Sequence, residues 1–185
     1  MSLIYVIRHG ETDQNVKCAY CGVSDIPLNS KGIHQAMEVG KILKNYSIDL
    51  ILCSTLIRAR QTARLINKSI HKDIVYIEEL VERSIGIFEG KTREEVMLQY
   101  SNLYNQNLTR QFDKAPPEGE TINEVIERVN IVFDLIKEKY NNKNILIVTH
   151  AFVSKVIHKY FNKINDVDFF AYSLKNCEVV EYRIE

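Results

Sequence analysis

The sequence predicts an α/β fold, a three-layer α/β/α sandwich with a mostly parallel central sheet and helices on both faces. Strand-like apolar runs alternate along the chain with segments of helical periodicity, which is typical of parallel strands joined by crossover helices. The first run, residues 3–8, is apolar without alternation, as in a central strand buried on both faces. The chain has 185 residues and contains no internal repeat or long linker, so we expect one domain over 1–185.

The local pattern predicts each element. The strand-like runs lie at 3–8, 49–53, 74–78, 144–149 and 178–184. Apolar residues recur every three or four positions in the expected helices 30–46 and 121–140, and further helices are expected at 56–68, 93–106 and 152–161. Two capping boxes, Thr92 with Glu95 and Thr121 with Glu124, predict where two helices begin. The segment near 92–115 is expected to form a small helical insertion over one end of the sheet.

Composition and charge exclude several classes of protein. Lys and Arg number 24 and Asp and Glu number 24, so the chain lacks the basic excess that is usual in nucleic-acid binders. It shows neither a signal-peptide pattern nor an apolar run of about 18 residues. Its four cysteines do not resemble a disulfide framework. We therefore expect a cytoplasmic monomer or homodimer that binds neither nucleic acid nor membrane.

Cationic and imidazole side chains follow three of the predicted strands. Arg8 ends the first strand and His9 follows it, His150 follows the fourth, and Arg58 begins the helix after the second. Ligands bind at the carboxyl ends of strands in open α/β sheets. A single histidine at a strand end is commonly structural, but two histidines with two arginines indicate a site. Because buried-edge cations need a partner, and guanidinium groups pair well with phosphate, we expect an anionic, phosphate-bearing ligand.

Six stretches together resemble a known family. They are RHGETDQN (8–15), SDIPLNSKGIHQA (24–36), STLIRARQTA (54–63), ERSIGIFEG (82–90), PPEGET (116–121) and IVTHAF (147–152). In this order they are similar to the motifs of the histidine phosphatase superfamily, also called phosphoglycerate-mutase-like, over nearly the whole chain. The resemblance implies the phosphoglycerate-mutase-like fold. It also implies an enzyme of the phosphatase branch, a phosphoric monoester hydrolase that needs neither cofactor nor metal.

The resemblance also implies a role for each matching residue. His9 matches the nucleophile that forms a phosphohistidine intermediate, and its neutral form has a free lone pair near pH 7. Arg8, Arg58 and His150 match the groups that hold the phosphoryl oxygens, and the cations should keep His9 neutral. Glu82, four residues before Gly86, matches the general acid/base.

Further positions carry weaker expectations. Asn15 matches a residue that commonly contacts the phosphate. Cys21 and Gly22 lie where other members carry a polar residue and glycine, and they are expected near the substrate. Cys18 and Cys21 have metal or redox spacing, but without a second pair a functional site there is not expected.

Three other glutamates lie close to Glu82. Glu78, Glu79 and Glu89 compete with it on residue type alone, and only the register of the family motif favours Glu82.

Several functions stay open at this point. The first is a metal-independent phosphatase for a small soluble phosphate ester, such as an alpha-ribazole phosphatase or a broad-specificity enzyme. The main alternative is a phosphoglycerate mutase, although mutases as a group run longer than this chain. A non-catalytic phospholigand-binding module is a further alternative. A metallohydrolase using His9 and His150 is disfavoured, because Arg8 and Arg58 would repel a dication. Specificity is expected to come from loops near 16–26 and 84–120.

Overall fold

A mostly parallel five-stranded sheet forms the centre of the computed structural model, which describes residues 2–184. The strands are β1 (Ser2–Arg8), β2 (Leu50–Ser54), β3 (Asp73–Ile77), β4 (Ile145–Thr149) and β5 (Val179–Ile184). Their order is β3-β2-β4-β1-β5, and every pair is parallel except β1 with β5 at one edge. The carboxyl ends of β1, β2 and β4 therefore meet at one edge of the sheet.

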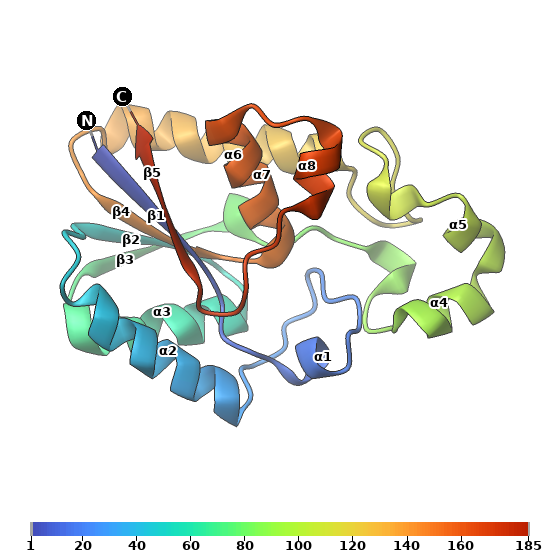
Figure 1. Ribbon diagram of the computed structural model, residues 1–185, viewed down its shortest axis with the longest axis horizontal. Coiled ribbons are helices and arrows are strands. Elements are labelled where there is room, and N and C mark those ends of the chain that lie inside the picture. Colours follow the sequence, from blue (N-terminus) through green and yellow to red (C-terminus); the bar gives the residue numbers. More distant parts are fainter. Residues whose placement is uncertain (1, 185) are drawn as a thin grey trace.

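Helices cover both faces of this sheet (Figure 1). One layer consists of α2 (Ser30–Leu43) and α3 (Ile57–Ile70). The other consists of α6 (Ile122–Lys139), α7 (Ala151–Asn162) and α8 (Asp166–Ala171). Alternate residues of β1 pack on opposite layers: Ile4 and Val6 face the second layer, whereas Tyr5 and Ile7 face the first. Burial on both faces explains the unbroken apolar run of β1, and the predicted three-layer sandwich is confirmed.

Both predicted capping boxes are present. Thr121 and Glu124 begin α6, and Thr92 and Glu95 begin α4 (Arg93–Gln99). The helix predicted at 93–106 is wrong in one respect, because it breaks at Tyr100 and resumes as α5 (Ser101–Asn105). The Tyr100 ring packs 5.9 Å from that of Phe88, and this tertiary contact outweighs the local helical pattern.

The segment that contains α4 and α5 projects beyond one end of the sheet (Figure 1). A 3-10 helix, η3 (Leu108–Arg110), completes it. Isolated bridges join Ala19 to Thr92 and Ile85 to Gly119. Backbone hydrogen bonding therefore attaches the segment to the rest of the protein near both of its ends. That the whole chain forms one domain stays a prediction.

Within residues 2–184, five short helices escape sequence analysis because they span too few residues for a periodic pattern. They are α1 (Asp13–Val16), η1 (Glu78–Leu80), η2 (Gly86–Phe88), η3 and α8. Consequently β3 ends at Ile77, and Glu78 belongs to η1 instead of the strand predicted at 74–78. Within residues 2–184, no helix combines the length and the apolar composition that crossing a membrane requires.

Candidate active site

The predicted histidines meet at the carboxyl edge of the sheet. His9 follows β1, and its backbone N–H donates to the Thr149 carbonyl at 2.9 Å, which extends the pairing of β1 with β4 by one residue. His150 follows Thr149 directly. The two imidazole ring centroids lie 5.1 Å apart. Adjacent parallel strands thus bring together two residues that are far apart in the sequence.

The surroundings of His9 fix its tautomer and its charge. Its Nδ1 lies 2.7 Å from the Gly10 carbonyl oxygen, which can only accept, so Nδ1 carries the hydrogen and Nε2 holds the lone pair. Burial lowers the pKa of His9 well below its usual value, and the charges of Arg58 and Arg8 lower it further. The ring is therefore neutral near pH 7, as the sequence predicted.

A tight turn after His9 requires glycine. The Gly10 N–H donates to Thr62 Oγ1 at 3.0 Å, and that hydroxyl donates in turn to the Arg58 carbonyl at 2.7 Å. A Cβ at position 10 would lie 2.5 Å from the Gly32 carbonyl oxygen. The start of α2 and the first two turns of α3 therefore pack directly against the turn that carries His9.

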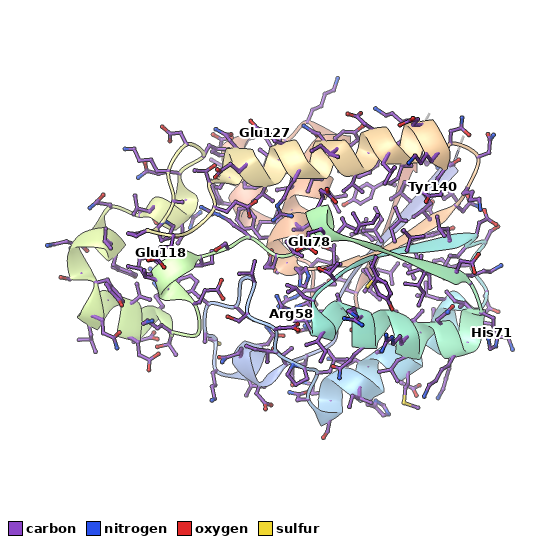
Figure 2. All side chains as sticks on the ribbon, turned by 180° about the vertical axis from the view of Figure 1, so that it is seen from behind. Arg58, His71, Glu78, Glu118, Glu127 and Tyr140 are labelled. Carbon is purple, nitrogen blue, oxygen red and sulfur yellow. The ribbon has the colours of Figure 1, made fainter. Side chains whose placement is uncertain are left out.

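Arg58 is fully buried in the first turn of α3 (Figure 2). Its Nη2 donates to the Gly22 carbonyl at 2.6 Å and its Nη1 to the Ser24 carbonyl at 2.7 Å. Its Nε donates to Nδ1 of His150 at 3.2 Å. Every nitrogen of this guanidinium is thereby engaged, and the group is held close to both histidines.

Glu89 shapes the loop that holds Arg58. Its carboxylate accepts from the backbone N–H of Gly22 at 3.1 Å and of Val23 at 3.0 Å, and from the Ser24 hydroxyl at 2.7 Å. These bonds fix residues 22–24, whose carbonyls bind Arg58. Glu89 is thus committed to this loop. Glu78, another alternative to Glu82 as the acid/base, is exposed and accepts from the Thr55 hydroxyl at 2.6 Å (Figure 2).

A cavity of about 270 Å³ opens beside His9. Of the predicted site residues, it is lined by Arg8, His9, Asn15, Cys21 and Glu82. Arg58, His150 and Gly22 do not line it, and the side chains of Arg58 and His150 are fully buried. The sequence could not distinguish the lining residues from the buried ones, because residues that follow strand ends, such as His9 and His150, fall in both sets.

A larger cavity of about 570 Å³ lies against the 93–110 segment. It shares Tyr20 and Thr109 with the first cavity but includes neither His9 nor Glu82. We assign the chemistry to the smaller cavity, because only there do an imidazole and a carboxylate face the same space.

Glu82 occupies the amino end of α7. Its carboxylate accepts from the backbone N–H groups of Arg83 at 2.9 Å, Phe152 at 3.0 Å and Val153 at 3.3 Å. The first N–H groups of a helix have no acceptor within the helix, so α7 supplies donors that orient this side chain. Of the four neighbouring glutamates, only Glu82 lines the cavity.

Arg8 and Asn15 offer donors to the same cavity. Arg8 Nη1 donates to the Leu174 carbonyl at 3.0 Å, while its buried Nε has no partner. Oδ1 of Asn15 accepts from the Thr12 N–H at 3.1 Å and from Nδ2 of Asn176 at 3.2 Å. Since Oδ1 is occupied, Nδ2 is the group that Asn15 presents to a ligand.

Two cationic residues and an amide are among the site residues that sequence reasoning missed. Arg83 and Lys155 line the cavity, and Asn176 supports His9 by donating to its carbonyl at 2.9 Å. Lys155 lies four residues after Ala151, and residues with this spacing lie on the same face of a helix. The helical periodicity of α7 could therefore have predicted that Lys155 lies near the site. Asn176 lies in a connection without periodicity, where no such signal exists.

The cysteines and metal-binding side chains give no further site. Cys18 is exposed and outside the cavity lining, whereas Cys21 lines the cavity and burial raises the pKa of its thiol. Between residues 2 and 184, no three His, Cys, Asp or Glu side chains are grouped so as to hold a metal ion.

Comparison with known proteins supports one family. The model of the histidine phosphatase superfamily (branch 1) matches residues 4–185. The uncharacterized phosphatase PhoE of Bacillus subtilis (strain 168) is 36% identical over 169 residues, which cover 91% of this chain and 80% of the relative. The probable phosphoglycerate mutase GpmB of Escherichia coli O1:K1 is 33% identical over 151 residues, covering 82% and 70%.

Solved structures show the same fold. The alpha-ribazole phosphatase from Shigella flexneri superposes with a TM-score of 0.90 at 28% sequence identity. The match covers 99% of this chain and 91% of the other.

Proposed function

This chain belongs to the histidine phosphatase superfamily, and on that premise we propose that it hydrolyses a small soluble phosphate monoester through a phosphohistidine on His9. One observation carries the proposal. A neutral His9, with its lone pair on Nε2, lines the same cavity as the carboxylate of Glu82. A nucleophile and an acid/base that share one cavity are the two groups that a two-step phosphoryl transfer requires.

In the first step, Nε2 of His9 attacks phosphorus. The Nε2–P bond forms, the P–O bond of the ester breaks, and the departing alcohol oxygen takes a proton from Glu82. Arg8 and Asn15 donate to the phosphoryl oxygens. Arg58 adds positive charge near His9, and the three acceptors that hold it limit its movement.

In the second step, water replaces the imidazole at phosphorus. Glu82, now ionised, accepts a proton as the water oxygen bonds to phosphorus and the N–P bond breaks. The products are inorganic phosphate and His9 in its starting form. The alcohol fragment leaves between the steps, so water needs access to the cavity only after the first step.

A phosphoglycerate mutase is the second candidate, favoured by the similarity to the probable phosphoglycerate mutase of E. coli. The first step would be the same, but the phosphoryl group would pass to a hydroxyl of a phosphoglycerate instead of to water. Incubation with 3-phosphoglycerate separates the two functions. Formation of 2-phosphoglycerate indicates a mutase, and release of inorganic phosphate indicates a phosphatase.

The proposal is tested with a panel of phosphate esters scored by kcat/KM. The panel includes alpha-ribazole phosphate, 3-phosphoglycerate and p-nitrophenyl phosphate, with His9→Ala as the matched inactive variant. We expect phosphate release by the native protein that survives treatment with a chelator. Ligand binding without turnover of any ester would contradict the proposal and favour a non-catalytic module. Loss of turnover with the chelator would favour a metallohydrolase.

A further inference from the structure

The loop that supplies the acceptors for Arg58 has no regular secondary structure. Residues 22–29 lie between α1 and α2 and belong to no helix or strand. Arg58 nevertheless depends on this loop, because its Nη2 and Nη1 donate to the Gly22 and Ser24 carbonyls. Without a helix or a sheet to fix them, these carbonyls are positioned by the side chains that attach the loop to neighbouring elements. Those attachments therefore determine where the Arg58 guanidinium lies.

Asp25, the residue after Ser24, binds the first residue of α3. The backbone N–H of Ile57 donates to Oδ1 of Asp25 at 2.6 Å. The N-cap residue Leu56 provides no side-chain acceptor for this end of the helix, and the first N–H groups of a helix have no acceptor within it. The helix dipole also favours a carboxylate at this end. Asp25 therefore supplies, from the loop, the cap that α3 lacks locally.

Two consecutive residues of the loop thus bind two consecutive residues of α3. The Ser24 carbonyl accepts from the Arg58 side chain, and the Asp25 carboxylate accepts from the Ile57 backbone. The second bond fixes the start of the helix relative to the loop. Because of it, the helix presents Arg58 to the Ser24 carbonyl at the distance that a hydrogen bond requires.

Asp25 is neither a counterion of Arg58 nor part of the catalytic cavity. Its side chain is exposed and does not line that cavity. In the described chain no ion pair joins Asp25 to Arg58. Glu89 attaches the preceding part of the loop through the Gly22 N–H and the Ser24 hydroxyl. Any effect of Asp25 on Arg58 therefore passes through the geometry of α3 and the loop.

We propose that Asp25 is a positioning residue for the phosphoryl transfer. By capping α3 it holds Arg58 where this side chain stabilises the charge that develops on the phosphoryl oxygens. This deepens the proposed function and rests on it. Arg58 is fully buried and uses all of its nitrogens as donors, so a shift of α3 against the loop breaks at least one of its bonds. A displacement of about 1 Å near a reacting group can lower a rate by about 100-fold.

Two substitutions of Asp25 test the cap. Asp25→Ala removes the acceptor, whereas Asp25→Asn keeps an oxygen at the same position without the charge. We expect kcat/KM for p-nitrophenyl phosphate to fall by about tenfold in Asp25→Ala. In Asp25→Asn it should stay within about threefold of the native value, because an asparagine oxygen also caps helices well.

Asp49→Ala is the matched control. Asp49 is likewise exposed, and its carboxylate also accepts from a backbone N–H of another segment, that of Asn144 at 2.8 Å. It directly precedes β2 and so lies at the edge of the sheet opposite the site. This variant should keep the native kcat/KM even if its melting temperature falls.

A double-mutant cycle shows whether Asp25 acts through Arg58. In Arg58→Lys the loop carbonyls have already lost the guanidinium, so adding Asp25→Ala should lower kcat/KM by less than about twofold. An undiminished tenfold loss in that background would overturn the proposal, because Asp25 would then act independently of Arg58. Native kcat/KM in Asp25→Ala would overturn it too. So would equal losses in Asp25→Ala and Asp25→Asn, since the charge and not the capping oxygen would then matter.

Failure of the phosphatase proposal has a different signature, namely that the native protein hydrolyses no ester. NMR then still tests the positioning role, because the Nε–H of Arg58 is observed without a ligand and is assigned by its absence in Arg58→Lys. In the native protein this N–H is buried and donates to Nδ1 of His150, so it exchanges slowly with solvent. Asp25→Ala should speed this exchange by about tenfold relative to Asp49→Ala. Equal exchange rates in the two variants would refute the proposal.

Discussion

Nδ1 of His150 accepts a hydrogen bond from Nε of Arg58 at 3.2 Å. Because the Nε–H of arginine can only donate, the proton of His150 must be on Nε2, which donates to the Ser54 hydroxyl at 2.8 Å. Burial lowers the pKa of His150 well below its usual value, and Arg58 lowers it further. The neutral His150 thus positions Arg58, and its hydrogen bonds to Arg58 and Ser54 determine its tautomer.

Replacing Arg58 by lysine should reduce kcat/KM by about 100-fold, although the charge is kept. A lysine has one nitrogen and cannot bond the Gly22 and Ser24 carbonyls and His150 in the geometry of a guanidinium. Steady-state kinetics on a phosphate ester checks this, with thermal unfolding to verify folding. Arg64→Lys, at an exposed position of the same helix, is the matched control. Native activity in the Arg58→Lys variant would show that charge alone suffices.

Replacing His9 by alanine should lower turnover by about 10³-fold or more while leaving the protein folded. The imidazole supplies the lone pair on Nε2, and no second imidazole lines the cavity. Reactions quenched in base should yield a base-stable, acid-labile phosphoryl label on His9. His34→Ala, on the exposed surface of α2, serves as the control. A label on His150 instead would show that His150, and not His9, is the nucleophile.

The buried histidines should make stability depend on pH below 6.5. In the folded protein the pKa values of His9 and His150 lie well below 6.5 because both rings are buried near arginines. Below pH 6.5 the unfolded chain therefore binds more protons than the folded one, and the free energy of unfolding falls as pH falls. The largest slope is about 1.4 kcal/mol per pH unit for each histidine.

Denaturant unfolding at several pH values between 5 and 8 measures this slope. His150→Asn should flatten it, while His71→Gln, at an exposed position, should not change it. His158 supplies a remaining slope, because burial lowers its pKa as well. Equal slopes in the native protein and His150→Asn would mean that His150 is not held neutral by the fold.

The sequence was sufficient for the sheet and for the edge where the site lies. Unbroken apolar runs that end at Arg8 and Thr149 reveal central strands, because burial on both faces requires such runs. The depth of each side chain could not be predicted. Whether a residue lines the cavity or lies behind it depends on loops such as 22–24, whose conformation is set by Glu89, 65 or more residues away. Arg83 was missed for the same reason, since its environment comes from Thr109 and Glu120.

The position of Glu82 leads to a prediction that depends on the leaving group. A general acid helps most when the leaving oxygen is strongly basic. An alkyl phosphate needs a proton to release its alkoxide, whereas p-nitrophenolate departs largely without one. In Glu82→Gln, kcat/KM should therefore fall by about 100-fold or more for an alkyl ester and far less for p-nitrophenyl phosphate. The comparison uses kcat/KM or the burst, because loss of the base also slows hydrolysis of the intermediate.

Controls must separate proton transfer from loss of orientation, because Glu82 also accepts from the start of α7. A displaced α7 would slow both substrates by the same factor, whereas a lost proton donor slows them unequally. Glu78→Gln, at an exposed position, should leave both rates near native. Glu89→Gln should weaken the 22–24 loop and slow both esters equally, through Arg58. If Glu89→Gln discriminates between the esters and Glu82→Gln does not, the acid is Glu89, and the carboxylate in the cavity only positions α7.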